Sequence, residues 1–343
     1  MTTHETLYRK YRPQKFSEVI NQDDVVSLLT NSISEERISH AYIFAGSRGT
    51  GKTSVARILA RELGTTDDDL YEIDAASNRG IDDIRALRET IETLPFSSPK
   101  KVYLIDEAHM LTREAWNALL KTLEEPPKHV IFILATTELE KIPETIQSRC
   151  QVCEFKKPTR AILSKVISKI AKKEGFEIEE ESSDLISLMA NGSFRDAIGG
   201  LQKTISSVTN KIIKLIDTEK SLGAPKEALI EKFIVSVGKK ETDNALKALH
   251  EAKDNDMNME LFGKLTLEKI RDIVLIKFSP THEQNLTHRY SEERIKFIKE
   301  CAGSKEMQWN GEVLRKLLLS VMESERSFIP ELSLELFAIG LSS

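Results

Sequence analysis

The chain has 343 residues, 40% of them hydrophobic and 30% charged, a composition typical of a globular protein with a sizeable core and two or three domains. Its net charge of -5 gives no overall positive potential that would indicate nucleic-acid binding, although a local basic surface is compatible with that total. No signal-peptide run opens the sequence, and no apolar stretch approaches the ~20 residues that cross a bilayer, so we expect a cytoplasmic protein without membrane contact.

Strands alternate with helical patterns in the first part of the chain, and this predicts an α/β domain over residues 1–157. Apolar runs without alternation, such as VYLI and VIFIL, are typical of parallel strands buried on both faces. We therefore expect a mostly parallel sheet covered by helices on each side. The expected strands span residues 41–45, 70–74, 101–106, 129–136 and 151–155.

After residue 157 the apolar spacing becomes helical and no convincing strand follows. Gly223 and Pro225 mark a second break. The sequence thus predicts an all-α domain over 158–222 and another over 223–343. Amphipathic segments in the last domain are expected around residues 242–252, 259–277, 291–301 and 311–324.

The segment GSRGTGKT matches the phosphate-binding pattern G-x-x-x-x-G-K-[ST], and it lies between an expected strand and an expected helix. Its glycines let backbone N–H groups converge on phosphate oxygens, Lys52 supplies a positive charge, and Thr53 offers a hydroxyl to Mg²⁺. A glycine turn without a ligand would leave Lys52 unexplained. The candidate nucleotide-binding residues are Gly46, Ser47, Arg48, Gly49, Thr50, Gly51, Lys52, Thr53 and Ser54.

Two carboxylates follow the strand expected at 101–106. Asp106 can complete the Mg²⁺ shell, and Glu107 can polarise a water molecule for attack on the γ-phosphate. Acids after a buried strand are costly unless a metal or a reacting water uses them, so they predict hydrolysis. The next strand ends in Thr136 and Thr137, and either hydroxyl could orient the same water.

Two arginines are further candidates. Arg149 follows the threonine strand, and its guanidinium could stabilise transition-state charge on ATP bound by a neighbouring subunit; the alternative is a solvated surface charge. Arg195 in GSFRDA could fold over the bound nucleotide, although a lone helix arginine is usually a surface residue. Cys150 and Cys153 form one C-x-x-C, but no second pair or neighbouring histidine completes four zinc ligands, so two small residues at a strand edge are expected.

Six ordered segments closely resemble the bacterial DNA polymerase III gamma/tau subunits, the ATPase family of the sliding-clamp loader. The resemblance is dense from Leu7 to about Gly200, and FIPELSLELFAIGL at 328–341 is similar to the family's collar end. The segments are LYRKYRPQKFSEVINQ, HAYIFAGSRGTGKTSVARILAREL, YEIDAASNRGIDDIR, KVYLIDEAHMLTREAWNALLKTLEEPP, FILATTELEKIPETIQSRC and NGSFRDA.

This resemblance implies an AAA+ module with a helical lid and a collar that assembles a ring with delta and delta-prime subunits and further copies of the chain. ATP binding would shape this ring to hold an open sliding clamp on primer-template DNA. The resemblance implies a Walker A loop at 46–53, a Walker B pair, an arginine finger, a sensor arginine and a first sensor. The Walker B pair is Asp106 with Glu107, and the arginine finger is Arg149. The sensor arginine is Arg195, and the first sensor is Thr136 or Thr137.

The resemblance also implies an adenine pocket formed by Tyr8, Arg12 and Pro13, and an interface-facing helix that contains Lys121. The sequence departs from this family in one respect. Gamma/tau subunits usually insert a four-cysteine zinc module after the loop helix, whereas the corresponding segment here, ARELGTTDDDLYEID, contains no cysteine. We therefore expect no structural zinc. In this absence the region resembles the small subunits of replication factor C, whereas IDAASNRGIDDIR, NALLKTLEEPP and LATT favour the bacterial family. From the length we also expect a gamma-like subunit without a tau-type extension.

Besides a subunit like the small subunits of replication factor C, two alternatives remain open. DEAH at 106–109 is a helicase signature, but residues 156–343 offer no second nucleotide-facing domain, and His109 is then expected at the surface or core edge. The other alternative is a structural clamp-loader subunit that binds nucleotide without hydrolysing it. DNA contact is expected at backbone phosphates, and the candidates are Arg79, Arg85 and Arg113, together with the helix from Arg113 to Lys121.

Overall fold

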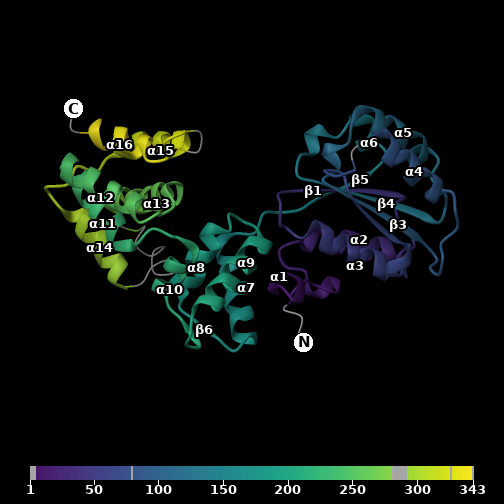
Figure 1. The fold of residues 1–343 in the computed structure, drawn as a ribbon, viewed down its shortest axis with the longest axis horizontal. Helices are drawn as coiled ribbons and strands as arrows, with labels where there is room; N and C mark the ends of the chain where they lie inside the picture. Colours follow the sequence, from purple (N-terminus) through teal and green to yellow (C-terminus); the bar gives the residue numbers. More distant parts are fainter. Residues whose placement is uncertain (1–4, 79, 280, 282–291, 325–326, 342–343) are drawn as a thin grey trace. The chain divides into compact units, whose positions relative to one another are not determined.

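The structure is a computed structural model that describes residues 5–78, 80–279, 281, 292–324 and 327–341 (Figure 1). The chain divides into two compact units, one formed by residues 1–166 with 190–199 and the other by residues 167–189 with 200–343. Each unit is considered by itself below. The division into three domains at residues 157 and 222 stays a prediction.

A five-stranded parallel sheet forms the centre of the first unit, with the order β2-β3-β4-β1-β5. Three strands have the predicted bounds, and the other two differ from the prediction by one residue. In register, Ala45 pairs with Thr136 and Asp74 pairs with Asp106, so the carboxyl ends of the strands meet at one edge of the sheet. The strands are β1 Ala41–Ala45, β2 Leu70–Asp74, β3 Lys101–Asp106, β4 Val130–Thr136 and β5 Gln151–Glu154.

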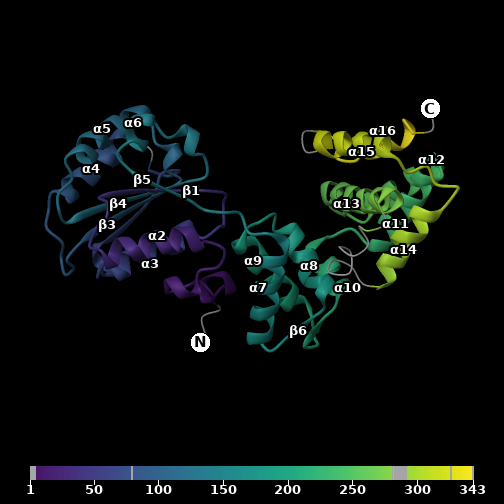
Figure 2. The same cartoon turned by 180° about the vertical axis from the view of Figure 1, so that it is seen from behind.

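Helices cover both faces of this sheet, as the unbroken apolar strands predict (Figures 1 and 2). Tyr42 and Phe44 of β1 pack with the helices of one face, whereas Ala41 and Ile43 pack with those of the other. The first face carries α2 (Asp23–Ser34) and α3 (Lys52–Glu62). The second face carries α4 (Ile81–Ile91), α5 (Arg113–Glu124) and α6 (Glu144–Gln147).

Helices dominate the rest of the chain, and the four amphipathic segments expected there are confirmed as α12–α15. The expectation of no further strand was wrong in one detail, because Glu177 and Ile178 pair in parallel with Ile212 and Ile213. The remaining elements are α1 Leu7–Lys10, α7 Arg160–Lys173, β6 Glu177–Ile178, α8 Glu180–Met189, α9 Phe194–Ser207, β7 Ile212–Ile213, α10 Leu215–Leu222, α11 Glu227–Gly238, α12 Thr242–Asp254, α13 Met259–Phe278, α14 Glu292–Gly303, α15 Gly311–Ser324 and α16 Leu332–Ile339. Short 3-10 turns lie at Phe16–Glu18, Asp67–Asp69, Ala108–Met110 and Leu139–Lys141.

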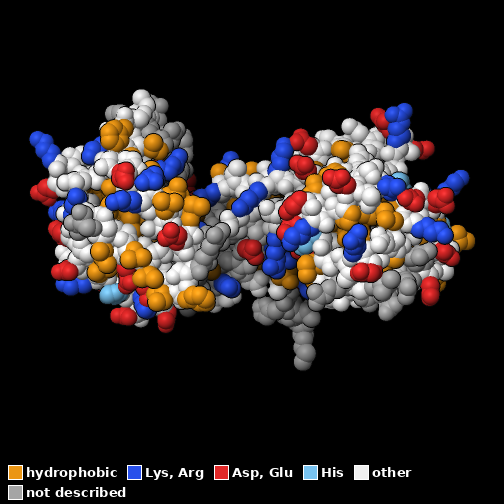
Figure 3. Space-filling model, turned by 90° about the horizontal axis from the view of Figure 1, so that it is seen from above, with side chains coloured by type: hydrophobic (Ala, Val, Ile, Leu, Met, Phe, Trp, Pro, Cys, Tyr) orange, Lys and Arg blue, Asp and Glu red, His pale blue; other side chains and the backbone are white. Residues whose placement is uncertain are grey.

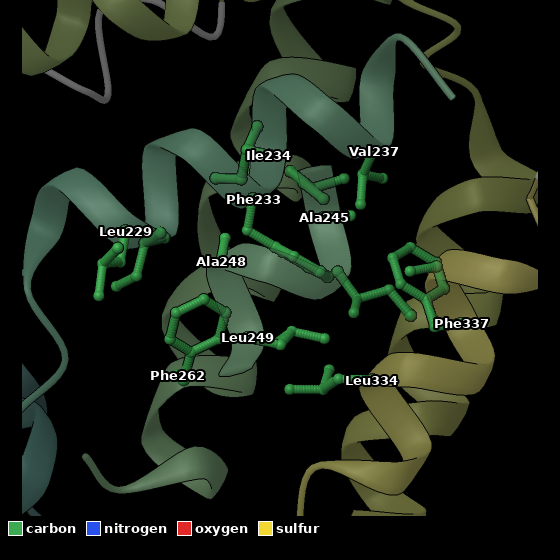
Figure 4. Packing of buried hydrophobic residues seen from close by; sticks show 14 of the residues in the cluster. Leu229, Phe233, Ile234, Val237, Ala245, Ala248, Leu249, Phe262, Leu334 and Phe337 are labelled. Atoms are coloured by element: carbon green, nitrogen blue, oxygen red, sulfur yellow. The ribbon is translucent and has the colours of Figure 1, made fainter. Parts of the chain in front are cut away.

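The C-terminal helices share one large apolar core (Figure 4). Phe233 of α11 and Phe262 of α13 meet edge to face with ring centroids 5.6 Å apart. Leu249 of α12 and Leu334 of α16 are fully buried in the same cluster. Burial of a leucine or phenylalanine side chain contributes about 1.5–3 kcal/mol, so this core, whose buried members all lie between residues 229 and 338, stabilises the C-terminal helices.

The surface is mixed in charge. Acidic and basic side chains are interspersed with apolar ones over the face shown in Figure 3, as the small net charge leads one to expect. Among the described residues, no helix has both the length and the apolar character that a membrane span requires.

A buried aspartate organises the segment between α3 and β2. Asp69 is fully buried, and its carboxylate accepts hydrogen bonds from the backbone N–H groups of Phe96 (2.7 Å), Ser97 (2.9 Å) and Ser98 (2.9 Å). The Thr66 backbone N–H also donates to Ser98 Oγ at 2.9 Å. These bonds connect the turn before β2 to the loop before β3 within the protein chain alone.

We expect Asp69→Asn to lower the free energy of unfolding by about 1–3 kcal/mol at pH 7, because an amide cannot accept all three N–H bonds. Burial raises the pKa of Asp69, but the backbone hydrogen bonds from Ser97, Phe96 and Ser98 outweigh it, so the pKa lies below its ordinary value. A lowered carboxyl pKa stabilises the folded state above the unfolded value of about 3.9, and this stabilisation is lost as the pH falls through the folded pKa. The difference between variant and wild type in chemical denaturation should therefore shrink below about pH 4.

The matched control is Asp68→Asn, because Asp68 is exposed in the same turn. Its unfolding free energy should match that of the wild type. Equal stability of both variants at pH 7 would show that the Asp69 carboxylate does not organise this loop.

Candidate active site

The phosphate loop joins β1 to α3, which begins at Lys52. Gly49 has a φ of +74°, and a Cβ at this position would lie 2.0 Å from Ser193 Oγ, so only glycine fits. The Thr50 hydroxyl donates to the Ser47 carbonyl at 2.8 Å and closes the loop from within. The strand, the glycine-rich loop and the helix therefore have the arrangement that phosphate binding requires.

The Lys52 ammonium is buried beside this loop and donates to the carbonyl oxygens of Gly46 (2.6 Å) and Ser47 (3.0 Å). Burial lowers the pKa of Lys52, while the carboxylates of Glu107 and Asp106 act in the opposite direction. These loop carbonyls provide only dipoles for a buried charge. Phosphate oxygens would give the ammonium a charged partner in the same place.

Thr53 and Asp106 meet at the carboxyl edge of the sheet. The Thr53 hydroxyl donates to Asp106 Oδ2 at 3.0 Å. Mg²⁺ prefers hard oxygen ligands and is usually bound by one or two protein groups together with substrate phosphates and water. This hydroxyl and carboxylate fit Mg²⁺, and the loop beside them fits the phosphates.

Glu107 has a left-handed backbone with a φ of +49°, which is uncommon for a residue other than glycine. Its backbone N–H donates to Asp106 Oδ1 at 3.0 Å. Its carboxylate accepts a long hydrogen bond from the Thr137 hydroxyl, with 3.4 Å between the oxygens. The turn thus directs the two adjacent carboxylates to different partners.

The two threonines at the end of β4 have different surroundings. Thr136 is fully buried, and its hydroxyl accepts from the Glu138 backbone N–H (3.0 Å) and lies 3.1 Å from His109 Nδ1. Thr137 is half-buried and donates to Glu107. Of the two hydroxyls that the sequence could not separate, that of Thr137 contacts the carboxylate.

His109 is the residue that sequence reasoning missed. Its side chain is only 7% exposed, which agrees with the core edge, one of the two positions expected for it, and both ring nitrogens have polar neighbours. The sequence signal was its place two residues after Glu107, at a turn that follows a buried strand. Strand alternation does not extend into such a turn, so the direction of the ring could not be read from the sequence.

The start of α9 contacts the phosphate loop directly, because the Phe194 N–H donates to the Gly49 carbonyl at 2.9 Å. Arg195 follows with an exposed side chain. Burial is the main cause that lowers the pKa values of Lys52 and Arg12, and the charge of Arg195 lowers both further. The charge of Arg195 therefore acts on both the loop lysine and Arg12.

Tyr8 lies in α1, and its pKa is lowered by hydrogen bonds, first with Thr6, and more weakly by the charge of Arg195. Pro13 is half-buried just after this helix. The structure thus brings Tyr8 close to the arginine at the start of α9. The other candidates differ in exposure: Ser54 is half-buried in the first turn of α3, whereas Ser47 and Arg48 are exposed in the loop.

Arg149 does not belong to this group. It lies just before the amino end of β5, where it donates to Glu124 Oε1 (2.7 Å) and to the Thr145 carbonyl (2.6 Å). The phosphate loop follows the carboxyl end of the neighbouring parallel strand, and a strand of this length spans about 13–17 Å. Arg149 therefore lies at the sheet edge opposite to its own chain's phosphate loop.

The C-x-x-C residues point to different places. Cys150 packs against the apolar cluster of the α4–α6 face, and Cys153 is buried in the cluster of the α2–α3 face. Burial raises the pKa of each thiol to about 12. The two sulfur atoms are therefore not arranged to bind one metal ion together.

Of the candidate DNA contacts, Arg79 and the side chain of Arg85 lie outside the described residues. Arg113 and Lys121 are exposed at the two ends of α5. They are eight residues apart, so they lie on one face of that helix.

Comparisons with known proteins agree with this geometry. The doubly covered parallel sheet, the phosphate loop and the paired acids define a P-loop protein of the AAA+ class. Solved structures of Thermotoga maritima RuvB share the fold, with a TM-score of 0.53 and 22% identity over 66% of this chain and 79% of that one. Sequence relatives identify the family within this class.

The chain belongs to the DNA polymerase III gamma/tau subunit family. It is 35% identical to the DNA polymerase III subunit gamma of Buchnera aphidicola subsp. Schizaphis graminum, with 92% of each chain covered. It is 40% identical over 299 residues to the DNA polymerase III subunit tau of Bacillus subtilis, a match that covers 81% of this chain and 53% of that protein. Residues 21–79 and 65–159 also match the family described as DNA polymerase III, delta subunit.

The chain spans about half the length, or less, of some of these curated relatives. The matches cover 53% of the Bacillus subtilis protein, 47% of the Mycoplasma genitalium gamma/tau subunit and 34% of the Mycoplasma pneumoniae one. Family membership therefore rests on the aligned region, and what the complete relatives do bears on this chain as a proposal.

Proposed function

We propose that this chain is an ATP-hydrolysing subunit of a sliding-clamp loader. ATP binding shapes a ring that holds an open clamp on primer-template DNA, and hydrolysis releases the clamp closed on the duplex. The observation that carries the proposal is the pair of contacts at one sheet edge, Thr53 with Asp106 and Thr137 with Glu107, directly beside the phosphate loop. The gamma/tau family supports the replication role.

The chemistry assigns each of these groups a task. Mg²⁺, when bound by Thr53 and Asp106, neutralises phosphate charge. Glu107 accepts the proton of a water molecule whose oxygen bonds to the γ-phosphorus, while the bond between that phosphorus and the bridging oxygen breaks to give ADP and phosphate. Thr137 is the first sensor in this proposal, because its hydroxyl contacts the Glu107 carboxylate.

The nucleotide is held by the loop and its neighbours. Lys52 pairs with the phosphates, and Arg195 acts as the sensor arginine from the start of α9, which is bonded to the loop. The adenine lies near Tyr8, Arg12 and Pro13 in this proposal, and two observations support it. The charge of Arg195 lowers the pKa of both Tyr8 and Arg12, though more weakly than other causes, which supports a position of α1 and its following turn near the start of α9.

Assembly completes the site. Arg149 lies at the sheet edge opposite to its own loop, which supports a role as a finger at a neighbouring subunit's ATP. The partners are delta and delta-prime subunits, further copies of this chain, the sliding clamp and primer-template DNA, in the cytoplasm. Arg113 and Lys121 lie on one exposed face of α5, where they can meet DNA phosphates.

ATP turnover of the chain separates this proposal from its alternatives. We expect weak turnover of the chain alone and strong stimulation by delta-type partners, clamp and primed DNA together. Glu107→Gln should retain ATP binding and lower the stimulated kcat by about 10²–10⁴-fold, since it removes the general base. The control Glu62→Gln, at the exposed last residue of α3, should match the wild type.

Other outcomes identify the alternatives. ATP binding without turnover in the complete assembly would indicate a structural subunit. Assembly with archaeal or eukaryotic-type replication factor C partners, but not with delta-type subunits, would favour the replication factor C alternative. Strand separation by the purified chain would favour the helicase alternative.

A further inference from the structure

His109, whose side chain is 7% exposed, is at the centre of a small polar network beside Glu107. Its Nδ1 lies 3.1 Å from Thr136 Oγ1 and 3.6 Å from Glu107 Oε2. Its Nε2 lies 3.3 Å from Glu138 Oε1. The Glu138 backbone N–H donates back to Thr136 Oγ1 at 3.0 Å, so threonine, imidazole and glutamate form a closed circuit.

For a neutral imidazole, the donors and acceptors of this circuit select one arrangement of protons. Thr136 Oγ1 accepts from the Glu138 N–H, which leaves its own proton to donate to His109 Nδ1. A neutral ring that accepts at Nδ1 carries its proton on Nε2, where Glu138 Oε1 can accept it. Every polar atom of the circuit is then satisfied without any bond to Glu107.

In this arrangement the imidazole ring makes no hydrogen bond to the Glu107 carboxylate, but it limits how closely the carboxylate can approach. The Nδ1 lone pair already accepts from Thr136, so this nitrogen, 3.6 Å from Glu107 Oε2, offers the carboxylate no hydrogen bond and opposes a closer approach. On the other side Thr137 donates to the same oxygen. The carboxylate is thus confined between an imidazole that does not bond it and a hydroxyl that does.

We propose that His109 is a positioning residue for hydrolysis, which links the end of β4 to the orientation of the Glu107 carboxylate. The inference rests on the proposed ATPase function of Glu107. His109 touches neither nucleotide nor the attacking water; it acts through the carboxylate beside it. The second glutamate of the circuit, Glu138, is paired with Lys141 at 2.7 Å, which fixes the far side of the ring.

The test compares three substitutions in the assembled clamp loader with ATP, clamp and primed DNA. His109→Ala opens space beside the carboxylate and should lower the stimulated kcat by about 10–100-fold, the cost of a misplacement of about 1 Å. The Kd for ATP should stay within about twofold of wild type, because no phosphate-loop contact changes. A purely structural role would instead lower the melting temperature without this separation of kcat from binding.

Two conservative variants distinguish the ring nitrogens. An asparagine amide occupies the place of Nδ1 and can accept from Thr136, so His109→Asn should recover most of the lost kcat. A glutamine amide occupies the place of Nε2 and can reach only Glu138, so His109→Gln should recover little. Equal recovery by both variants would overturn the role assigned to the Nδ1 edge.

The matched control is His129→Ala. His129 precedes the other end of β4, where its Nε2 lies 3.2 Å from the Ile91 carbonyl and 3.1 Å from the Thr93 carbonyl. Its loss should lower stability and leave kcat unchanged. If His109→Ala keeps the wild-type kcat, the inference is wrong while the ATPase proposal stands; if the wild type itself hydrolyses no ATP in the assembly, both fail.

Discussion

Arg149→Ala is expected to leave ATP binding unchanged and to remove most of the DNA-stimulated hydrolysis of the assembled clamp loader. An arginine finger contributes about 10³–10⁵-fold to kcat, and a finger supplied by a neighbour plays no part in binding to the chain's own loop. The pair with Glu124 does not hold the finger back, because both side chains are partly exposed and such pairs contribute about 0–1 kcal/mol. The measurements are nucleotide affinity and single-turnover hydrolysis in the same assembly.

Two companion variants make this result specific. Arg149→Lys keeps the charge but lacks the planar fork of the guanidinium, so it should recover only a small part of kcat. Arg37→Ala removes an arginine that is 81% exposed and should change nothing. Wild-type turnover of Arg149→Ala in the full ring would show that Arg149 is a surface residue and not a finger.

Lys52→Ala is expected to abolish nucleotide binding at ordinary ATP concentrations. Truncating one member of a buried, hydrogen-bonded charge pair costs about 2–5 kcal/mol, which corresponds to a loss of affinity of about 30–5000-fold. The variant should still fold, because the ammonium is buried among carbonyl dipoles and the burial of a charge costs stability. Titration with a fluorescent ATP analogue measures the affinity, and thermal unfolding without nucleotide confirms the fold.

Lys128→Ala is the control, since Lys128 is exposed before the amino end of β4, away from the loop. Its affinity and its thermal shift on addition of ATP should equal those of the wild type. Wild-type affinity of Lys52→Ala would contradict the phosphate-loop assignment itself.

The sheet and the phosphate loop could be predicted from the sequence because their signals are local. An apolar run such as that of β4 identifies a strand buried on both faces, and the glycine spacing of the loop identifies a backbone that approaches phosphate. The order of the strands then brings Thr53 and Asp106 together, although 53 residues separate them. Parallel strands with a shared carboxyl edge make that meeting a consequence of the fold.

The roles within the site could not be predicted in the same way. Thr136 and Thr137 are neighbours of the same type, and only the turn after β4 decides which hydroxyl reaches Glu107. His109 has no periodic context, so its burial depends on the left-handed backbone of Glu107. Asp69 gave no sequence signal for its three backbone partners, because these lie 27 to 29 residues away in a loop.

The burial of the cysteines has a consequence for labelling chemistry. Thiol reagents attack the thiolate, and a pKa of about 12 at Cys150, Cys153 and Cys301 leaves roughly one thiol in 10⁵ ionised at neutral pH. A cysteine introduced at an exposed position would therefore react with a maleimide dye far faster than the three natural ones. Fluorescent probes can be attached to the otherwise unaltered chain without first removing its own thiols.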